Sequence, residues 1–277
     1  MHAPLFWRRL ARDRWAMVGL ILVIALVALA AAAPWLARGD PLRGALADSV
    51  HPPSRAFLFG TDVQGRDVFA RVLFGARLSL SVGLVSQAIA CALGLALGLV
   101  AGYAGRWVDA GVMRLADVTL AFPSLLLLIA IAAAVRPSLP LVFVVIGVVG
   151  WAGMARLVRG QVLVVRALEY VQAARALGAS DARIIARHLL PNVLAPVVVA
   201  ATLGIGGAIM AEAALSFVGL GAQPPTPSWG AMVADGRDLL RVAPWVSLFP
   251  GVAIGLTVLG VNLLGDGLRD ALDVRAR

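Results

Sequence analysis

The sequence predicts an all-α membrane protein with six transmembrane helices. Of its 277 residues, 61% are hydrophobic and only 14% are charged, which is far more apolar than a soluble domain. The apolar residues gather in long runs, each near the roughly 20 residues that a helix needs to cross a bilayer. Lipid cannot hydrogen-bond to the backbone, and the runs lack the alternation of a β-barrel, so helices are expected. The predicted spans are residues 16–36, 78–102, 115–135, 139–155, 193–220 and 246–264.

The spans also predict how the chain is threaded through the membrane. The first apolar run is longer than the about 7–15 residues of a secretory signal, so it is expected to remain as a helix. If the N-terminus starts in the cytoplasm, six spans return the C-terminus there, and the larger share of the arginines falls in cytoplasmic segments. The predicted organisation is a cytoplasmic tail 1–15, a first transmembrane helix 16–37, an external loop with an interfacial helix 38–77, a five-helix core 78–268 that includes a cytoplasmic loop 156–192, and a cytoplasmic tail 269–277.

The charge pattern excludes several classes of function. The formal charge of +9 comes from 24 basic residues scattered between the spans, without a basic face that would bind nucleic acid. All of them are arginine, so this chain lacks the lysine of a P-loop phosphate site. Cys91 lies in an apolar run, where we expect it to pack as a small hydrophobic residue. Histidines at metal-ligand spacing are not found, and no metal site is predicted.

The external loop ends in a pattern with two interpretations. Phe69, Val72, Leu73 and Ala76 recur at helical spacing beside arginines. This pattern is typical of a short interfacial helix that leads into the second span, and equally of an early start to that span.

The segment 221–244 is predicted to be a fixed loop on the outside rather than a helix. It contains three prolines within four residues, at positions 224, 225 and 227. Trp229 and Trp245 are expected to anchor at the membrane interface.

The segment 156–192 is too charged to cross a membrane, yet it is longer than a simple connection requires. Val171, Ala174 and Leu177 predict the apolar face of a first short helix, which Gly178 interrupts. Two amphipathic helices are therefore expected in this segment.

The second short helix has its own start and stop signals. Ser180 is a suitable N-cap, and Asp181 places a negative charge in the first turn. Ile184 belongs to its apolar face. His188 falls in the last turn, where positive charge suits the helix dipole, and Pro191 marks the predicted end.

Three polar positions fall within or at the edge of the predicted spans: Asp117, Glu212 and Asn262. Polar groups are costly at these depths and need partners. Glu212 is expected either to line a translocation path or gate, or to make a structural contact between helices. We favour the structural contact.

Several sequence blocks stand in order along nearly the whole chain. The blocks are Phe59-Gly60-Thr61-Asp62 with Gly65-Arg66-Asp67, Ala121-Phe122-Pro123, Gln172-Ala173-Ala174 with Gly178, Ile184 and His188-Leu189-Leu190-Pro191-Asn192, Glu212-Ala213-Ala214-Leu215-Ser216-Phe217, and Asn262-Leu263-Leu264-Gly265-Asp266. They resemble the ABC transporter permeases of the dipeptide, oligopeptide and nickel family, which depend on a binding protein, and specifically their C-type inner-membrane subunit. The central block is similar to the EAA loop of such permeases.

The resemblance implies the type I ABC importer permease fold, in the bacterial cytoplasmic (inner) membrane. It implies a heterodimer with a sister permease subunit, two ATPase subunits or domains that bind ATP and Mg²⁺, and an extracytoplasmic substrate-binding protein. This chain would then bind no cofactor and would not be an enzyme. The residues expected to couple it to the ATPases are Gln172, Ala173, Ala174, Gly178, Ala179, Ser180, Ile184, His188, Leu190 and Pro191.

Two questions stay open at this point. Gln172 stands where the EAA motif usually has glutamate, so no essential ionic contact is assigned to this position. The cargo implied by the resemblance is di- or oligopeptides, with nickel chelates or glutathione-like molecules as alternatives. A secondary transporter driven by an ion gradient is a further alternative, although inverted repeats and broken helices are not evident in the sequence.

Overall fold

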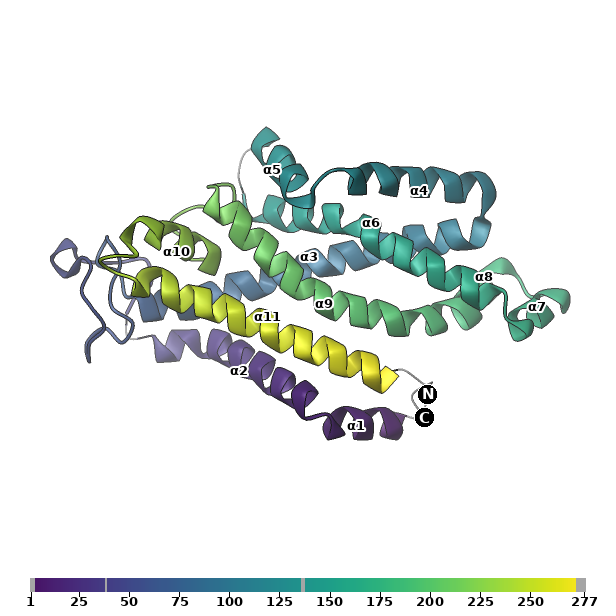
Figure 1. The fold of residues 1–277 in the computed structure, drawn as a ribbon, viewed down its shortest axis with the longest axis horizontal. Coiled ribbons are helices and arrows are strands. Elements are labelled where there is room, and N and C mark those ends of the chain that lie inside the picture. The colour runs from purple at the N-terminus through teal and green to yellow at the C-terminus, as the bar shows by residue number, and fades with distance from the viewer. Residues whose placement is uncertain (1–2, 38, 136–137, 273–277) are drawn as a thin grey trace.

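The computed structural model describes residues 3–37, 39–135 and 138–272, which form an elongated bundle of long helices (Figure 1). No strand occurs among these residues, apart from one isolated bridge between Thr61 and Asp67. The elements are α1 (Ala3–Arg12), α2 (Arg14–Leu36), η1 (Leu46–Asp48), α3 (Val68–Ala104), α4 (Arg106–Ala121), α5 (Ser124–Ala134), α6 (Leu139–Arg166), α7 (Glu169–Ala176), α8 (Asp181–Ile184), the π-helix η2 (Ile185–Leu189), α9 (Leu190–Phe217), α10 (Trp229–Gly236), η3 (Arg237–Leu239) and α11 (Trp245–Leu272).

Five helices among the described residues are long and apolar enough to cross a membrane, and a bent pair makes six possible spans. The pair is α4 and α5, which meet at an angle of 91°. The prediction of one continuous third helix over 115–135 is therefore wrong. Phe122 is extended, as a residue before proline prefers to be, and Pro123 cannot donate the hydrogen bond that would continue α4.

Helices α3 and α6 make the most extensive contact in the bundle, and glycines permit it. A Cβ atom on Gly94 would lie 2.4 Å from the Met154 side chain, and one on Gly98 would lie 2.6 Å from the Ala155 carbonyl oxygen. Gly102, one turn further on, is equally close to Val162. Small residues at four-residue spacing thus let the two backbones approach closely, which is how helices associate in lipid.

Helix α3 begins well before the predicted second span. It runs without a break from Val68, and the Asp67 side chain caps it by accepting the Phe69 N–H at 2.9 Å. Of the two interpretations of residues 69–76, the early start of the second span is therefore the one that the structure shows. These residues do not form a separate interfacial helix.

The two ends of the bundle differ in character. Helices α7 and α8 lie at one end, and α1 and the C-terminal end of α11 lie toward it (Figure 1). The loop of residues 39–67 and α10 lie at the opposite end. Helix α1 occupies most of the predicted 1–15 tail, and Asp13 caps α2 by accepting the N–H groups of Trp15 and Ala16. Residues 273–277 of the predicted 269–277 tail lie outside the described residues.

The segment 221–244 contains a helix, α10, which corrects the prediction of a loop without helix. Ser228 caps it by accepting the Ala231 N–H at 3.1 Å. Trp229 is only 1% exposed and donates its indole N–H to the Val72 carbonyl of α3 at 2.9 Å, so it is a core residue rather than an interfacial anchor. Trp245 is half-buried and donates to the Thr61 carbonyl at 3.0 Å.

A buried charge cluster holds the loop of residues 39–67 against the helices. The Asp62 carboxylate accepts the Arg66 Nε–H at 2.7 Å and lies 3.5 Å from Arg71 Nε. All three side chains are nearly inaccessible to solvent, and Arg71 also donates to the Pro41 carbonyl at 3.3 Å. Buried charges are tolerated when they are paired and hydrogen-bonded in this way.

The glycine contact between α3 and α6 generates a stability prediction. The Gly98→Leu substitution forces the helices apart and is expected to destabilise the fold by about 1–3 kcal/mol, the usual range for overpacking. Gly153→Leu on α6 is the matched control, because nothing lies within 4 Å of a Cβ there. Thermal unfolding of the purified chain in detergent measures both, and equal midpoints for the two variants would contradict this account of the packing.

Candidate functional site

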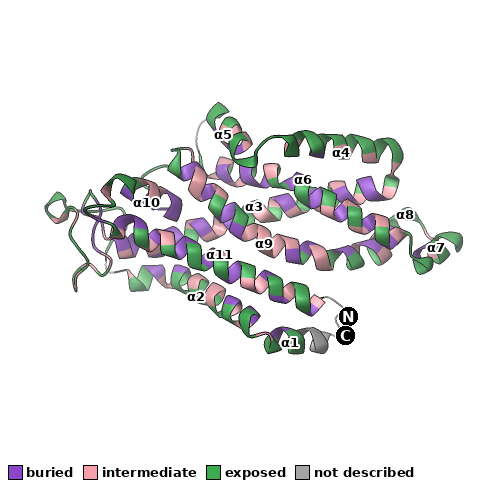
Figure 2. Ribbon diagram, viewed as in Figure 1, coloured by how far each residue is buried: buried purple, intermediate pink, exposed green. Residues whose placement is uncertain are grey.

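The candidate site is the segment that joins α6 to α9 at one end of the bundle, which we call the coupling segment (residues 167–192). Helix α7 is largely exposed there (Figure 2). Its Val171 is 2% exposed and packs into the core between α6 and α9, and Ile184 of α8 is fully buried in the same cluster. The apolar faces predicted for the two short helices are confirmed at these positions, but Leu177 is 88% exposed and does not belong to the first face.

Gly178 forms the turn between the two helices. Its φ is +83°, a left-handed conformation that glycine adopts without strain. The turn is closed by the Gly178 N–H, which donates to the Arg175 carbonyl at 3.0 Å, and by the Ala179 N–H, which donates to the Ala174 carbonyl at 3.1 Å. Nothing lies within 4 Å of a Cβ placed on Gly178, so the requirement for glycine is conformational rather than steric.

The remaining small residues of the motif lie around this turn. Ala173 is exposed, and Ala174 and Ala179 are half-buried. Ser180 occupies the N-cap position of α8, but its side chain makes no capping hydrogen bond, which corrects that part of the prediction. The Ser180 carbonyl accepts the Ile184 N–H at 2.9 Å.

The second short helix does not end at Pro191, contrary to prediction. Residues 181–217 form one helix. The π-turn η2 joins α8 to α9, and the Leu190 N–H donates to the carbonyl of Ile185, five residues earlier. A π-turn widens the hydrogen-bonded ring and lets the helix pass a residue that lacks an N–H. His188 is therefore inside a helix, with its ring 6.0 Å from that of Tyr170. Leu190 is half-buried at this junction.

Two contacts tie the coupling segment to the end of α3, and a third joins the end of α6 to it. The Tyr103 hydroxyl donates to the Asp181 carboxylate, and the Arg175 guanidinium lies 5.3 Å from the centre of the Tyr103 ring. Arg166, the last residue of α6, donates through Nη1 to the Gly102 carbonyl at 2.7 Å. Tyr103 was not predicted from the sequence, since it lies 78 positions from Asp181 and no local pattern marks the pair.

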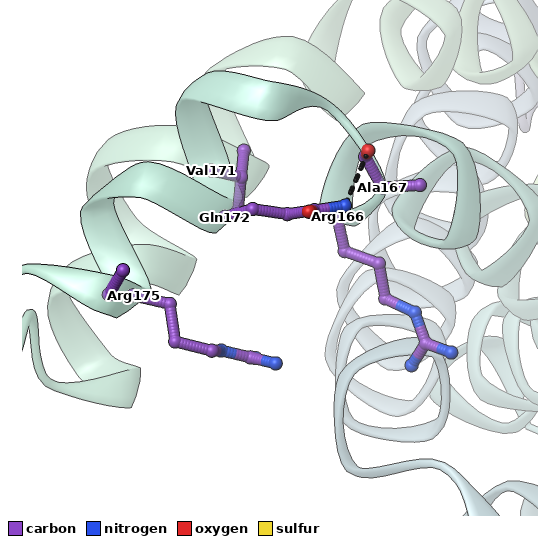
Figure 3. A pocket seen from close by; sticks show the side chains of 6 residues that line it. Arg166, Ala167, Val171, Gln172 and Arg175 are labelled. Atoms are coloured by element: carbon purple, nitrogen blue, oxygen red, sulfur yellow. Dashed lines mark hydrogen bonds between the residues drawn. The ribbon is translucent and has the colours of Figure 1, made fainter.

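A cavity of about 650 Å³ lies between the end of α6 and α7 (Figure 3). Gln172 borders it and donates its amide Nε2–H to the Ala167 carbonyl at 3.0 Å. The lining residues are Arg166, Ala167, Val171, Gln172, Arg175 and Ala176.

The three polar positions predicted within the spans do not come together. Glu212 is 1% exposed in α9, and its Oε1 accepts the Ser216 Oγ–H at 2.7 Å. Asn262 is exposed on α11. Asp117 is exposed on α4 and lies 2.5 Å from Arg156 of α6. Glu212 is thus buried among helices, whereas Asp117 helps hold α4 to α6.

A second ion pair that the sequence analysis missed also joins α4 to α6. Asp109 accepts both the Nε–H and the Nη2–H of Arg159, at 2.5 and 2.6 Å. This paired geometry is typical of a strong arginine–carboxylate contact. Among the described residues, no three His, Cys, Asp or Glu side chains are grouped so that they could hold a metal ion.

Comparison with solved structures places the fold among ABC importers. The structure resembles the inward-facing methionine ABC transporter MetNI with a TM-score of 0.62 and 20% identity, covering 73% of this chain and 96% of that chain. It resembles a chain of an amino acid ABC transporter with a TM-score of 0.55 and 15% identity, covering 72% of this chain and 94% of that chain.

Sequence comparison finds more closely related proteins. The dipeptide transport system permease protein DppC of Alkalihalophilus pseudofirmus is 46% identical, covering 98% of this chain and 89% of that protein. A putative peptide transport system permease protein of Brucella abortus is also 46% identical, covering 98% and 91%. The glutathione transport system permease protein GsiD of Pectobacterium atrosepticum is 44% identical, again covering 98% and 91%.

Two family descriptions match separate parts of the sequence. Residues 4–53 match the N-terminal TM domain of oligopeptide transport permease C. Residues 94–277 match the binding-protein-dependent transport system inner membrane component. The six possible spans and the importer fold agree with both matches. The chain therefore belongs to the family of binding-protein-dependent transport system inner membrane components, the permease subunits of ABC importers.

Proposed function

We propose that this permease subunit carries di- and oligopeptides across the bacterial cytoplasmic membrane, powered by separate ATPase subunits that bind to the coupling segment. The observation that carries the proposal is the exposed helix–turn–helix of α7 and α8 at one end of the bundle. Asp181 of α8 is hydrogen-bonded to Tyr103 of α3, and Val171 of α7 packs with buried valines of α6, so a push on α7 is expected to reach two spans at once. Rigid-body motion of packed helices is a common way to pass on a conformational change.

The proposal assigns the energy source and the remaining partners to other chains. ATP and Mg²⁺ bind to two ATPase subunits or domains, because this chain contains no lysine for a P-loop. A sister permease completes the pore as a heterodimer, and a substrate-binding protein delivers cargo from outside. Both termini then face the cytoplasm, on the same side as α7. The helices at that end of the bundle, α1 and the end of α11, support this orientation.

Peptides are the proposed cargo because relatives with nearly full coverage are named as dipeptide and peptide permeases. A glutathione permease is almost as similar, so glutathione-like molecules are the alternative, ahead of nickel chelates. The cargo is tested in proteoliposomes that contain the whole transporter. Labelled dipeptide uptake is expected to require ATP and the binding protein and to be blocked by excess unlabelled peptide. Uptake that an ionophore abolishes while ATP is retained would instead indicate a secondary transporter.

The Gly178 turn gives a direct test of coupling. Gly178→Pro is expected to abolish most of the ATPase stimulation by loaded binding protein, because proline holds φ near −65°. Gly178→Asn is the matched control, since asparagine tolerates positive φ and the site has room for a side chain. Stimulation is measured in reconstituted complexes of verified subunit composition. If Gly178→Pro kept full stimulation, the coupling role of this turn would be refuted.

Tyr103 is predicted to take part in coupling through Asp181. Tyr103→Phe removes the hydroxyl and keeps the ring under Arg175, and should loosen α8 from α3 by about 1 kcal/mol. We expect faster hydrogen exchange at residues 177–182 and weaker ATPase stimulation. Asp181→Ala, which removes the acceptor, should act similarly, and the double variant should be no worse than either single one, because both substitutions remove the same interaction. Fully additive effects would show that the two residues act separately.

A further inference from the structure

The cavity between α6 and α7 is positively charged. Arg166 at the end of α6 and Arg175 of α7 extend into the same space from two sides (Figure 3). None of the described residues that line the cavity is acidic. Its volume of about 650 Å³ is enough for several side chains or a small group of a partner protein.

Two acidic residues at this end of the bundle are already engaged in other contacts. Asp181 accepts the Tyr103 hydroxyl, and Asp109 is held by Arg159 through two hydrogen bonds. Arg166 donates to the Gly102 carbonyl through one nitrogen, and Arg175 lies over the Tyr103 ring. A guanidinium has five N–H donors, so each arginine keeps donors that these contacts do not use.

Gln172 explains why the charge of this cavity is not neutralised from within. It lies three residues before Arg175 on α7, where side chains on one helix face are neighbours. A glutamate at position 172 would pair with Arg175 from this position. The amide instead donates to the Ala167 carbonyl, a bond that a carboxylate cannot make.

We propose that this cavity receives a carboxylate side chain of the ATPase subunit, which Arg175 and Arg166 bind together. The inference rests on the proposed function, because it requires the ATPase to bind at the coupling segment. A carboxylate matches the forked geometry of a guanidinium group. It would accept hydrogen bonds from the N–H groups of Arg166 and Arg175 that are not used in the contacts with the Gly102 carbonyl and the Tyr103 ring. The permease therefore supplies the arginine of this ionic contact. Arg175 stays available because residue 172 is an amide that donates to the Ala167 carbonyl.

The test measures the affinity of purified ATPase subunits for the permease heterodimer in nanodiscs, over a series of salt concentrations. Arg175→Gln is expected to weaken binding about tenfold, the usual effect of losing a charge-assisted hydrogen bond, and to reduce its salt dependence. Gln172→Glu is expected to weaken binding as well, although it removes neither arginine. An increase in affinity for Gln172→Glu would overturn the proposal, because position 172 would then contact a basic residue of the ATPase.

Arg183→Gln is the matched control, since Arg183 is exposed on α8 and does not line the cavity. Arg183→Gln should leave the affinity for the ATPase subunits nearly unchanged. If it weakened binding as much as Arg175→Gln, binding would depend on the overall charge of the segment, and the proposal would be overturned. Unfolding midpoints and heterodimer assembly are compared for every variant. If the cavity variants bind normally while Gly178→Pro still abolishes stimulation, the cavity proposal fails and the proposed coupling function stands.

Discussion

The close approach of α3 to α6 is the constraint on which the rest of the structure depends. In lipid, the burial of apolar surface does not drive two helices together, so close van der Waals packing must stabilise their association. Gly94, Gly98 and Gly102 provide a strip without side chains, against which Met154 and its neighbours on α6 pack. The same strip leads directly to the end of α3, so the packing of the bundle also fixes where the coupling segment attaches.

Helix α4 is held to α6 by different means. The contact includes a small apolar cluster around Trp151, but two ion pairs, Asp109 with Arg159 and Asp117 with Arg156, span it as well. Exposed pairs of this kind contribute little individually, whereas the two-bond geometry at Asp109 orients its partner firmly. Since α4 bends away at Pro123 into the short α5, these pairs keep its first part aligned with the bundle.

The sequence was sufficient for the helical class and for the approximate places of five long apolar helices, because long apolar runs have few alternatives in a membrane. It did not give their ends: α3 begins at Val68, before the predicted second span, and α6 continues to Arg166, inside the predicted loop 156–192. It was insufficient where a proline's effect depends on its surroundings. The proline at 123 breaks a helix, the one at 191 is absorbed by a π-turn, and α10 forms directly after three prolines. Contacts such as Tyr103 with Asp181, 78 positions apart, leave no local pattern, so the attachment of the candidate site required the structure.

The turn at Gly178 contains a conformationally free residue, but the residues on either side of it are fixed to the bundle. Gly178 has open space around it, so the turn is free to be approached by another protein, while its φ of +83° limits which residues can replace it. Stiffness comes instead from either side: Val171 and Ile184 are anchored in the core, and Arg166 is bonded to α3. If the turn transmits motion as we propose, its displacement is expected to move α3, α6 and α9 together, because separating them would expose buried valines and break the charged contacts at the same time.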